Sequence, residues 1–266
     1  MKKFILLALC SFVFASPAQA ETQKAIYELY AGGINAAIAE LDLKLDKTKK
    51  LYDVKLLVQT KGFLARLVPW SGGFATKGWL TKEKPRPEQH KSWATWKEDT
   101  ESHIYNYKKD GTFVSLIEEE NGKPKDNRKL DKELGHGTVD MLSVTLHQIL
   151  QLAQQNECGV KDEVFDGKRR FALGFNPVAQ TRLKSDKYAA YEGDAVECTI
   201  EVTPTGGAWH EKARGWMNIQ DQGKRNGTIP TLWYANFNPA DKGTLQLPVK
   251  VRVKTDYGTF FMHRIR

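Results

Sequence analysis

The sequence has few cysteines and, after its first residues, no long apolar segment. Three cysteines occur in 266 residues, and no two are spaced as Cys-x-x-Cys, so the usual zinc and redox motifs are absent. Beyond residue 20 no stretch approaches the roughly 20 apolar residues of a transmembrane helix. The six histidines include no His-Glu-x-x-His or His-x-His pair. We therefore predict no metal site and no cofactor.

The common catalytic signatures are missing as well, including the Gly-x-Ser-x-Gly motif of many hydrolases. Ser143 and His147 lie four residues apart in a predicted helix that also contains Asp140, and such a pair would supply a nucleophile and its base. A polar side of a surface helix explains the same residues without any chemistry. We predict no catalytic residues and no enzyme activity, and a serine hydrolase centred on Ser143 and His147 stays as an alternative.

What the chain does contain, at its start, is a leader. Two lysines precede an apolar run over residues 4–14, and residues 16–20 end in Ala-Gln-Ala, which places small residues where a signal peptidase reads them. The sequence therefore predicts a signal peptide over 1–20, cut after Ala20. The mature protein is expected in the periplasm as one β-rich domain over 21–266.

The charge of the mature protein is basic. Removal of Lys2 and Lys3 lowers the formal net charge from +8 to +6. Export argues against nucleic acid as the partner, and the compatible partners are anionic lipid headgroups, lipopolysaccharide or acidic glycans. An alternative explanation of the basic charge is that a modest excess of lysine only keeps the protein soluble.

The cysteines form an even pair once the leader is removed. Cys10 lies within the leader, and Cys158 and Cys198 remain. In an oxidising compartment two cysteines favour a disulfide, which here closes a loop of about 40 residues. We predict a bond between Cys158 and Cys198.

Most of the mature chain follows the pattern of β-strands. Apolar residues alternate with polar or small ones over 34–45 and again over 52–60, which is the period of a half-buried strand. Asp-Gly and Asn-Gly pairs recur between such segments and favour hairpin turns. The stretch Lys82–Lys91, with two prolines, is predicted to be an exposed loop, and the segments 245–254 and 258–266 a final hairpin.

One segment, from Thr138 to about Glu157, has apolar residues at the three-and-four spacing of an amphipathic helix. Thr138 is the expected N-cap, with Asp140 in the first turn. We predict a mainly β fold, a strongly curved antiparallel sheet or an open or spiral barrel, with this one helix (about 138–157) plugging it.

Aromatic residues point to a contact surface. The chain has seven tryptophans, and the apolar stretch that ends at Trp70 is bounded by Gly62 and by Ser71-Gly72-Gly73. In a curled sheet, such residues line an apolar cavity or form a hydrophobic mouth, although many of them simply fill the core. The residues predicted to contact a ligand are Lys61, Phe63, Leu64, Arg66, Leu67 and Trp70.

Four segments and one cysteine follow one another along the mature chain: 27–34, 60–64, 139–143, Cys158 and 164–171. Together they resemble the exported bacterial proteins of domain-of-unknown-function family 3108. Met141 stands where the family often has proline, a change of little consequence at a helix start. The resemblance implies a periplasmic curled sheet wrapped around a helix, similar in architecture to lipoprotein carriers, and it brings no catalytic residues.

Two functions fit these observations. The first is a non-enzymatic protein of the cell envelope that binds a lipid, a lipoprotein acyl chain or another amphiphile against the concave sheet face, with Lys61 and Arg66 near anionic headgroups. The second is a scaffold whose sheet edges or aromatic loop dock an envelope protein. The second function predicts a cavity that is empty or tightly filled, and a protein partner that can be recovered by crosslinking.

Overall fold

A single antiparallel sheet of 14 strands makes up most of the structure. The computed structural model describes residues 21–125, 131–238, 245–256 and 258–266, so the predicted leader over 1–20 lies outside the described residues. The strands are β1 (Glu21–Ala31), β2 (Ile34–Asp46), β3 (Leu51–Thr60), β4 (Trp70–Leu80), β5 (Pro85–Trp96), β6 (Asp99–Tyr107), β7 (Phe113–Glu120), β8 (Lys123–Pro124), β9 (Lys161–Phe165), β10 (Arg169–Leu183), β11 (Gly193–Gly207), β12 (Thr231–Ala235), β13 (Leu247–Thr255) and β14 (Gly258–Arg264).

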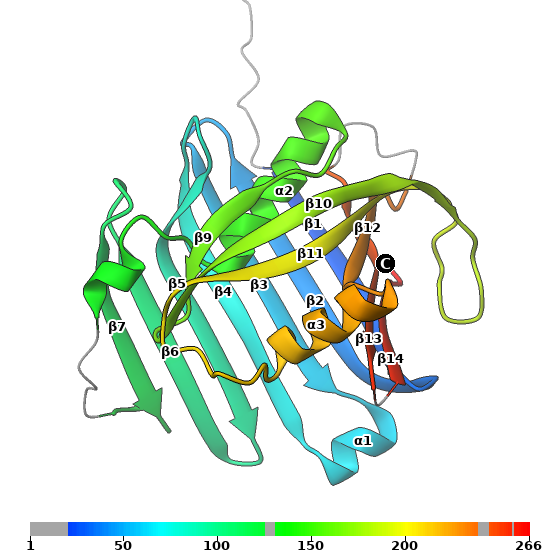
Figure 1. The fold of residues 1–266 in the computed structure, drawn as a ribbon, viewed down its shortest axis with the longest axis horizontal. Coiled ribbons are helices and arrows are strands. Elements are labelled where there is room, and N and C mark those ends of the chain that lie inside the picture. Colours follow the sequence, from blue (N-terminus) through cyan, green and yellow to red (C-terminus); the bar gives the residue numbers. More distant parts are fainter. Residues whose placement is uncertain (1–20, 126–130, 239–244, 257) are drawn as a thin grey trace, which may run out of the picture.

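The sheet has two arms that meet where the first and last strands pair. From β1 the strands run in sequence order to β8, and from β14 they run in reverse order to β9. Tyr27 of β1 lies opposite Arg264 of β14. Strands β8 and β9 are the two edges, so the sheet curls strongly without closing (Figure 1). This is the predicted curved, open, mainly β fold.

The inner face of the sheet carries the core. In β2 the alternate residues Ala37, Ala39, Leu43 and Leu45 are buried, which confirms the period-two pattern of the sequence. Successive side chains of a strand point to opposite faces, so these residues share the concave side. Ala39, Leu43 and Leu45 belong to one core cluster with apolar residues of β1, β3, β10 and β12 and of the helix that the sheet surrounds.

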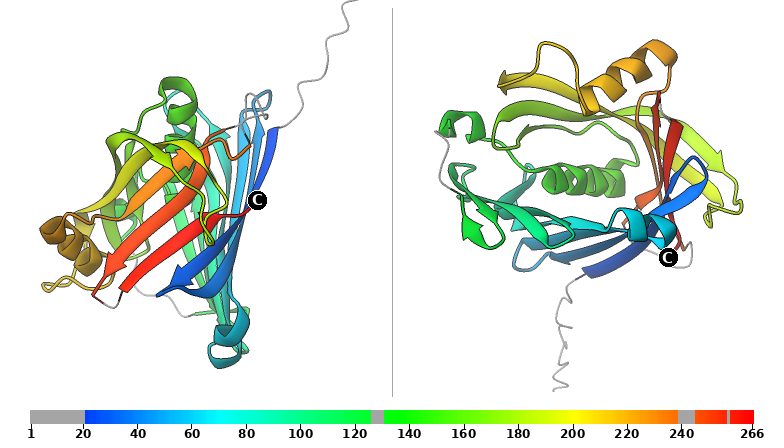
Figure 2. Two further views of the ribbon diagram at one scale, coloured as in Figure 1. Left: turned by 90° about the vertical axis from the view of Figure 1, so that its right-hand side faces the viewer. Right: turned by 90° about the horizontal axis from the view of Figure 1, so that it is seen from below.

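That helix, α2 (Met141–Gln155), lies inside the curve of the sheet, as the view from below shows (Figure 2). The helix predicted over about 138–157 is confirmed, but its N-cap is Asp140 rather than Thr138. The carboxylate of Asp140 accepts hydrogen bonds from the backbone N–H groups of Leu142 (2.9 Å) and Ser143 (3.2 Å). Thr138 lies two residues earlier and donates its hydroxyl to the carbonyl of Gly135.

The exit of α2 is fixed by covalent and polar contacts. Asn156, in the left-handed conformation, ends the helix, and the predicted disulfide joins Cys158 to Cys198 of β11 with a Cα–Cα distance of 6.1 Å. The amide oxygen of Gln148 accepts from the backbone N–H groups of Gly159 and Val160. The loop after α2 is therefore bound both to the helix and to the sheet.

Two further helices, α1 (Gly62–Leu67) and α3 (Trp216–Asn226), and one short 3-10 helix, η1 (Lys132–Gly135), were not predicted. The α3 segment is polar and has no clear apolar stripe in the sequence. It is held by Gln220, whose side-chain amide accepts from the N–H of Val202 (2.6 Å) and donates to its carbonyl (2.8 Å). The helix thus pairs with β11 through a buried side chain.

The prediction of an exposed loop over Lys82–Lys91 is wrong, because most of this stretch belongs to β5. Pro85 opens the strand, and Pro87 lies next to a register shift between β4 and β5. Both are places where a strand tolerates a residue without an N–H group. The prolines therefore mark the start and an irregularity of a strand.

A candidate apolar ligand site beneath the central helix

A cavity of about 190 Å³ lies between α2 and the concave face of the sheet. Nearly all of its wall is apolar, and residues of both arms of the sheet contribute. The lining residues are Tyr27, Leu41, Leu43, Val54, Leu56, Phe74, Met141, Leu142, Thr145, Leu146, Ile149, Leu232, Pro248 and Met262.

The sequence pattern explains why this wall is apolar. Leu41 and Leu43 are alternate residues of β2, Val54 and Leu56 are alternate residues of β3, and alternate residues point to one face. The helix contributes its three-and-four stripe from the other side. Met141, in the first turn of α2, is 48% exposed, so the cavity reaches the surface beside it.

One polar atom of the wall lacks a partner. The hydroxyl of Tyr27 is buried, and within the described part of the chain it makes no hydrogen bond. Burial raises the pKa of this phenol, so the group is neutral at physiological pH. Among the side-chain hydroxyls of the lining residues it is the one without a partner in the described part of the chain, since Thr145 donates to the carbonyl of Met141.

The start of α2 is fastened to the sheet by a buried polar network around Asp140. Thr76 of β4 donates its hydroxyl to the Asp140 carboxylate (2.8 Å) and lies 2.7 Å from Nδ1 of His90, which is 3.2 Å from the same carboxylate. Ser143 donates to the other carboxylate oxygen, and the Tyr52 hydroxyl lies 2.6 Å from the Ser143 oxygen. Since Ser143 donates to Asp140, Tyr52 is the donor to Ser143.

This network keeps Asp140 ionised. Burial alone would raise the pKa of the carboxyl, but the charge of His90 and the hydrogen bonds from His90, Ser143 and Thr76 outweigh burial and lower the pKa to about 2. The anion also lies at the N-terminus of α2, where the helix dipole favours it. The network holds one end of the helix over the cavity.

A second polar contact holds the middle of α2. His147 Nδ1 lies 2.7 Å from Asp162 of β9, and Lys84 donates to the same carboxylate at 2.7 Å. Ser143 is buried and directed to Asp140, whereas His147 is directed to Asp162. The structure thus places the two residues of the hydrolase alternative in separate networks.

The residues predicted to contact a ligand do not line this cavity. Phe63, Leu64, Arg66 and Leu67 form α1, Lys61 precedes it and Trp70 begins β4. They lie together at the end of the sheet where β3 turns into β4 (Figure 1). Sequence reasoning located the inner face through its alternation, but it did not show where helix and sheet stay apart.

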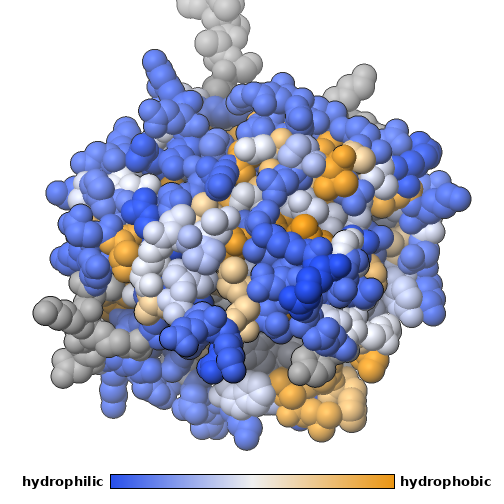
Figure 3. Space-filling view, viewed as in Figure 1, coloured by the Kyte–Doolittle hydropathy of each residue, from blue (hydrophilic) through white to orange (hydrophobic). Residues whose placement is uncertain are grey.

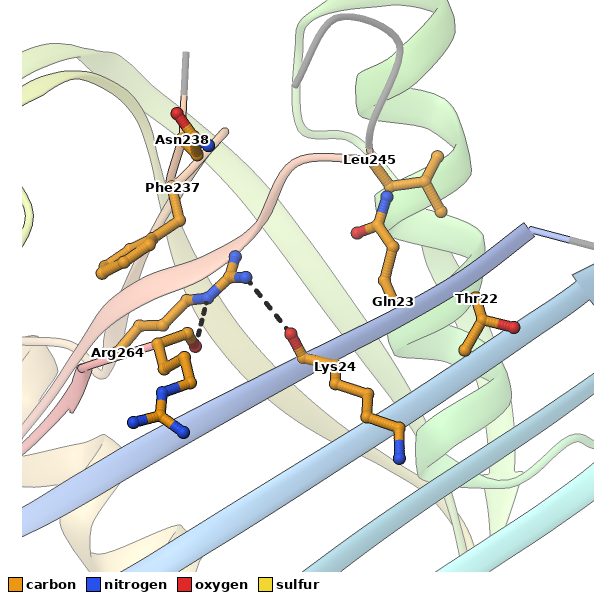
Figure 4. Close-up of a pocket in the computed structure, with 8 residues that line it drawn as sticks. Thr22, Gln23, Lys24, Phe237, Asn238, Leu245 and Arg264 are labelled. Atoms are coloured by element: carbon orange, nitrogen blue, oxygen red, sulfur yellow. Dashed lines mark hydrogen bonds between the residues drawn. The ribbon is translucent and has the colours of Figure 1, made fainter. Parts of the chain in front are cut away.

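A larger and more polar pocket, of about 600 Å³, lies where β1 meets β14. Lys24, Arg264 and Arg266 give it basic character, and Phe237 forms one side (Figure 4). The Arg264 guanidinium already donates to the backbone carbonyls of Arg266 (2.9 Å) and Lys24 (3.3 Å) and lies 4.8 Å from the Phe237 ring centre. The Arg264 guanidinium of this pocket therefore already has partners within the protein.

Within the described ranges there is no group of three or more His, Cys, Asp or Glu residues placed to hold a metal ion. In the same part of the chain, no helix has the length and apolar character needed to cross a bilayer. The apolar cavity beneath α2 is thus the site with the clearest chemical character.

Comparison with known proteins identifies a family. No curated protein matches the chain. Among solved structures, it is similar to the crystal structure of a β-barrel-like protein of domain of unknown function DUF1849 from Brucella abortus, with 10% identity, a TM-score of 0.47, and coverage of 91% of this chain and 95% of that one. The family of proteins of unknown function DUF3108 matches residues 26–264. The chain therefore belongs to the DUF3108 family.

Proposed function

We propose that this protein binds the apolar chain of a lipid or another amphiphile in the cavity beneath α2, as a non-enzymatic protein of the periplasm. The observation that carries the proposal is the wall of the cavity, which is nearly all apolar and is formed by the concave face of the sheet together with a helix that is fastened at both ends. Each methylene moved from water into such a site contributes about 0.8 kcal/mol. The periplasmic location rests on the leader sequence over 1–20.

The size of the cavity limits the ligand. Its volume of about 190 Å³ is below the roughly 300–1,000 Å³ of pockets that enclose a drug-sized molecule. One segment of an acyl chain fits, and the rest of the molecule would extend past the exposed Met141 toward solvent. The Tyr27 hydroxyl would receive an oxygen atom of the ligand, such as that of an ester or a carboxyl group.

The fastening of α2 supports binding with little rearrangement. The Asp140 network, the His147–Asp162 contact and the disulfide after the helix fix α2 relative to the sheet. A wall that is already in place needs no ordering when the ligand enters, so more of the burial energy becomes affinity.

A substitution pair on one strand tests the proposal. Leu56 lines the cavity, and Leu57 is the next residue of β3 and faces the opposite side of the sheet. Leu56→Trp fills the cavity, whereas Leu57→Trp adds the same bulk elsewhere. With cis-parinaric acid as a fluorescent probe, we expect Leu56→Trp to weaken binding at least about tenfold and Leu57→Trp to leave it unchanged.

Native mass spectrometry on the mature protein from its own periplasm is the companion measurement. A stoichiometric lipid that is released by solvent extraction supports the proposal and identifies the ligand. A bare protein mass that does not change on adding envelope lipids, together with equal probe binding by both tryptophan variants, would overturn it.

A further inference from the structure

The cavity beneath α2 has an open end and a closed end. Met141, in the first turn of α2, is 48% exposed, and the wall residues Leu56 of β3 and Phe74 of β4 are half-buried. The wall residues Tyr27 and Leu232, on β1 and β12, are buried, and Tyr27 is only 2% exposed. A ligand therefore enters beside Met141, and the part that enters first approaches Tyr27.

The contacts of α2 show how far apart these two ends are. Asp140, which precedes Met141, accepts a hydrogen bond from Thr76 of β4. Tyr27 belongs to β1, and two strands, β2 and β3, lie between β1 and β4. Since neighbouring strands are about 4.8 Å apart, the open and closed ends lie roughly 14 Å apart along the sheet. The end of the ligand that enters first is thus separated from solvent.

The closed end offers a hydrogen bond to that end of the ligand. The Tyr27 hydroxyl is buried and has no partner in the described part of the chain. A buried hydroxyl without a partner is unfavourable, and an oxygen atom of a ligand can accept its hydrogen. A purely apolar group at the same place would leave the hydroxyl without a partner.

The closed end does not suit a charged group. None of the lining residues is charged. Arg264 lies opposite Tyr27 in the sheet, but its guanidinium donates to the backbone carbonyls of Arg266 and Lys24. Burial raises the pKa of the Tyr27 phenol even though the charge of Arg264 acts to lower it. The surroundings of this hydroxyl therefore disfavour an anion.

The outer surface differs from the cavity in this respect. Figure 3 shows hydrophilic residues over most of one face of the molecule, with apolar residues in separate patches between them. A charged or bulky polar group of a ligand is well solvated there, whereas the wall of the cavity is nearly all apolar. Such a group stays outside, and only a small neutral one can follow a chain inward.

We propose that the cavity prefers a single-chain amphiphile that ends in a small uncharged oxygen group, and that this group enters first and accepts a hydrogen bond from Tyr27. Fatty alcohols, fatty esters of a small alcohol and protonated fatty acids have this chemistry. A phospholipid carries a bulky group at the oxygen-bearing end of its chains, so it could insert only a methyl end. The inference rests on the proposed function, because it concerns the same cavity.

Displacement of cis-parinaric acid by three probes with the same decyl chain length tests the inference. Decanol has a small neutral end group, decanoate at about pH 8 has a charged one, and decyl maltoside has a neutral but bulky one. We expect Tyr27→Phe to weaken decanol binding about fivefold, because one hydrogen bond to a neutral group is lost. Decanoate and decyl maltoside should bind the variant as they bind the wild type, which also shows that the variant is folded.

Tyr234→Phe is the matched control. Tyr234 is fully buried and its hydroxyl also lacks a partner in the described ranges, but it is not a lining residue of the cavity. This variant should bind all three probes as the wild type does. Decanol binding that Tyr27→Phe leaves unchanged, or that Tyr234→Phe weakens equally, would overturn the assignment of the end group and leave the proposed function intact. If no probe displaces cis-parinaric acid and Leu56→Trp does not weaken its binding, the proposed function fails, and this inference fails with it.

Discussion

Two buried tyrosines of the inner face, Tyr27 and Tyr52, differ in the partner of the hydroxyl group. Tyr52 donates to Ser143, whereas Tyr27 has no hydrogen-bond partner in the described part of the chain. Tyr52→Phe should lower the free energy of unfolding by about 1 kcal/mol, because the Ser143 oxygen loses its donor. Tyr27→Phe should leave stability unchanged or raise it by up to about 1 kcal/mol, because it removes an unpaired buried hydroxyl.

Urea unfolding of the two variants without added lipid measures this difference directly, since both substitutions delete one oxygen atom from a buried ring. An equal loss of stability in both variants would show that Tyr27 has a partner of its own. The Tyr27 variant also reports on the ligand, because weaker lipid binding without a stability change would place a polar ligand atom at the hydroxyl.

The Asp140 carboxyl makes stability depend on pH in the acid range. Its pKa is about 2 in the folded protein, compared with an ordinary value of 3.8. A lowered folded-state pKa contributes stability that is fully present above about pH 4 and is lost as the pH falls through about 2. The difference between the two pKa values corresponds to about 2 kcal/mol of folding stability.

The variant Asp140→Asn provides the control for this prediction, because an amide cannot titrate. Its free energy of unfolding should be lower than that of the wild type at pH 6, and the gap should narrow as the pH falls toward 2. Other lowered carboxyls, such as Asp162, destabilise both proteins equally in acid. A gap that stays constant across this range would contradict the assignment to Asp140.

Residue patterns predicted some of the candidate site and missed the rest. The alternation in β2 and β3 correctly placed Leu41 and Leu56 on the inner face. The cavity itself forms where the surfaces of α2 and the sheet do not meet, and no local sequence pattern predicts such a gap. The Asp140 network was also missed, because Thr76 and His90 lie 64 and 50 positions away along the chain. The prediction of α1 as a contact surface remains untested.

At the scale of elements, the segment after α2 depends on the disulfide. The bond between Cys158 and Cys198 closes a loop with a sequence separation of 40, and constraining such a loop in the unfolded chain contributes about 3–4 kcal/mol. Reduction should therefore lower the melting temperature, and thiol titration of the unreduced, unfolded protein should find no free thiol. The double variant Cys158→Ser with Cys198→Ser should melt at the temperature of the reduced protein and should not respond to reductant.

The elements that sequence reasoning found are those with a strong period. The strands β2 and β3 and the helix α2 alternate or repeat over many residues, so local pattern and tertiary burial agree. α1 has only six residues, and its apolar residues Phe63 and Leu67 are exposed, so the stretch fits a strand as well as a helix. In α3 the apolar residues Trp216 and Met217 lie in the first turn and pack against the core, and the buried hydrogen bonds of Gln220 to Val202 hold the middle of the helix.

At the scale of the whole molecule, the fold class followed from the sequence but the arrangement of the sheet did not. Many strands, recurrent hairpin turns and one amphipathic helix predict a curved sheet around that helix. The pairing of β1 with β14 joins residues that are 229 to 237 positions apart, and hairpin signals describe only neighbours. The sheet also stays open between its edge strands β8 and β9. Hairpin signals do not predict this, because closure depends on how strand twist accumulates over 14 strands.

The pairing of β1 with β14 bears on how the chain folds. Strands β1 to β8 are consecutive neighbours, so each can join its predecessor soon after it is synthesised. β1 has a partner on one side only until β14, the last strand, is in place. Until then its free edge presents unpaired N–H and C=O groups, the feature that lets edge strands recruit other chains. A chain that stops before Gly258 would leave this edge of β1 unpaired in the middle of the sheet. No strand of one arm would then be hydrogen-bonded to a strand of the other arm.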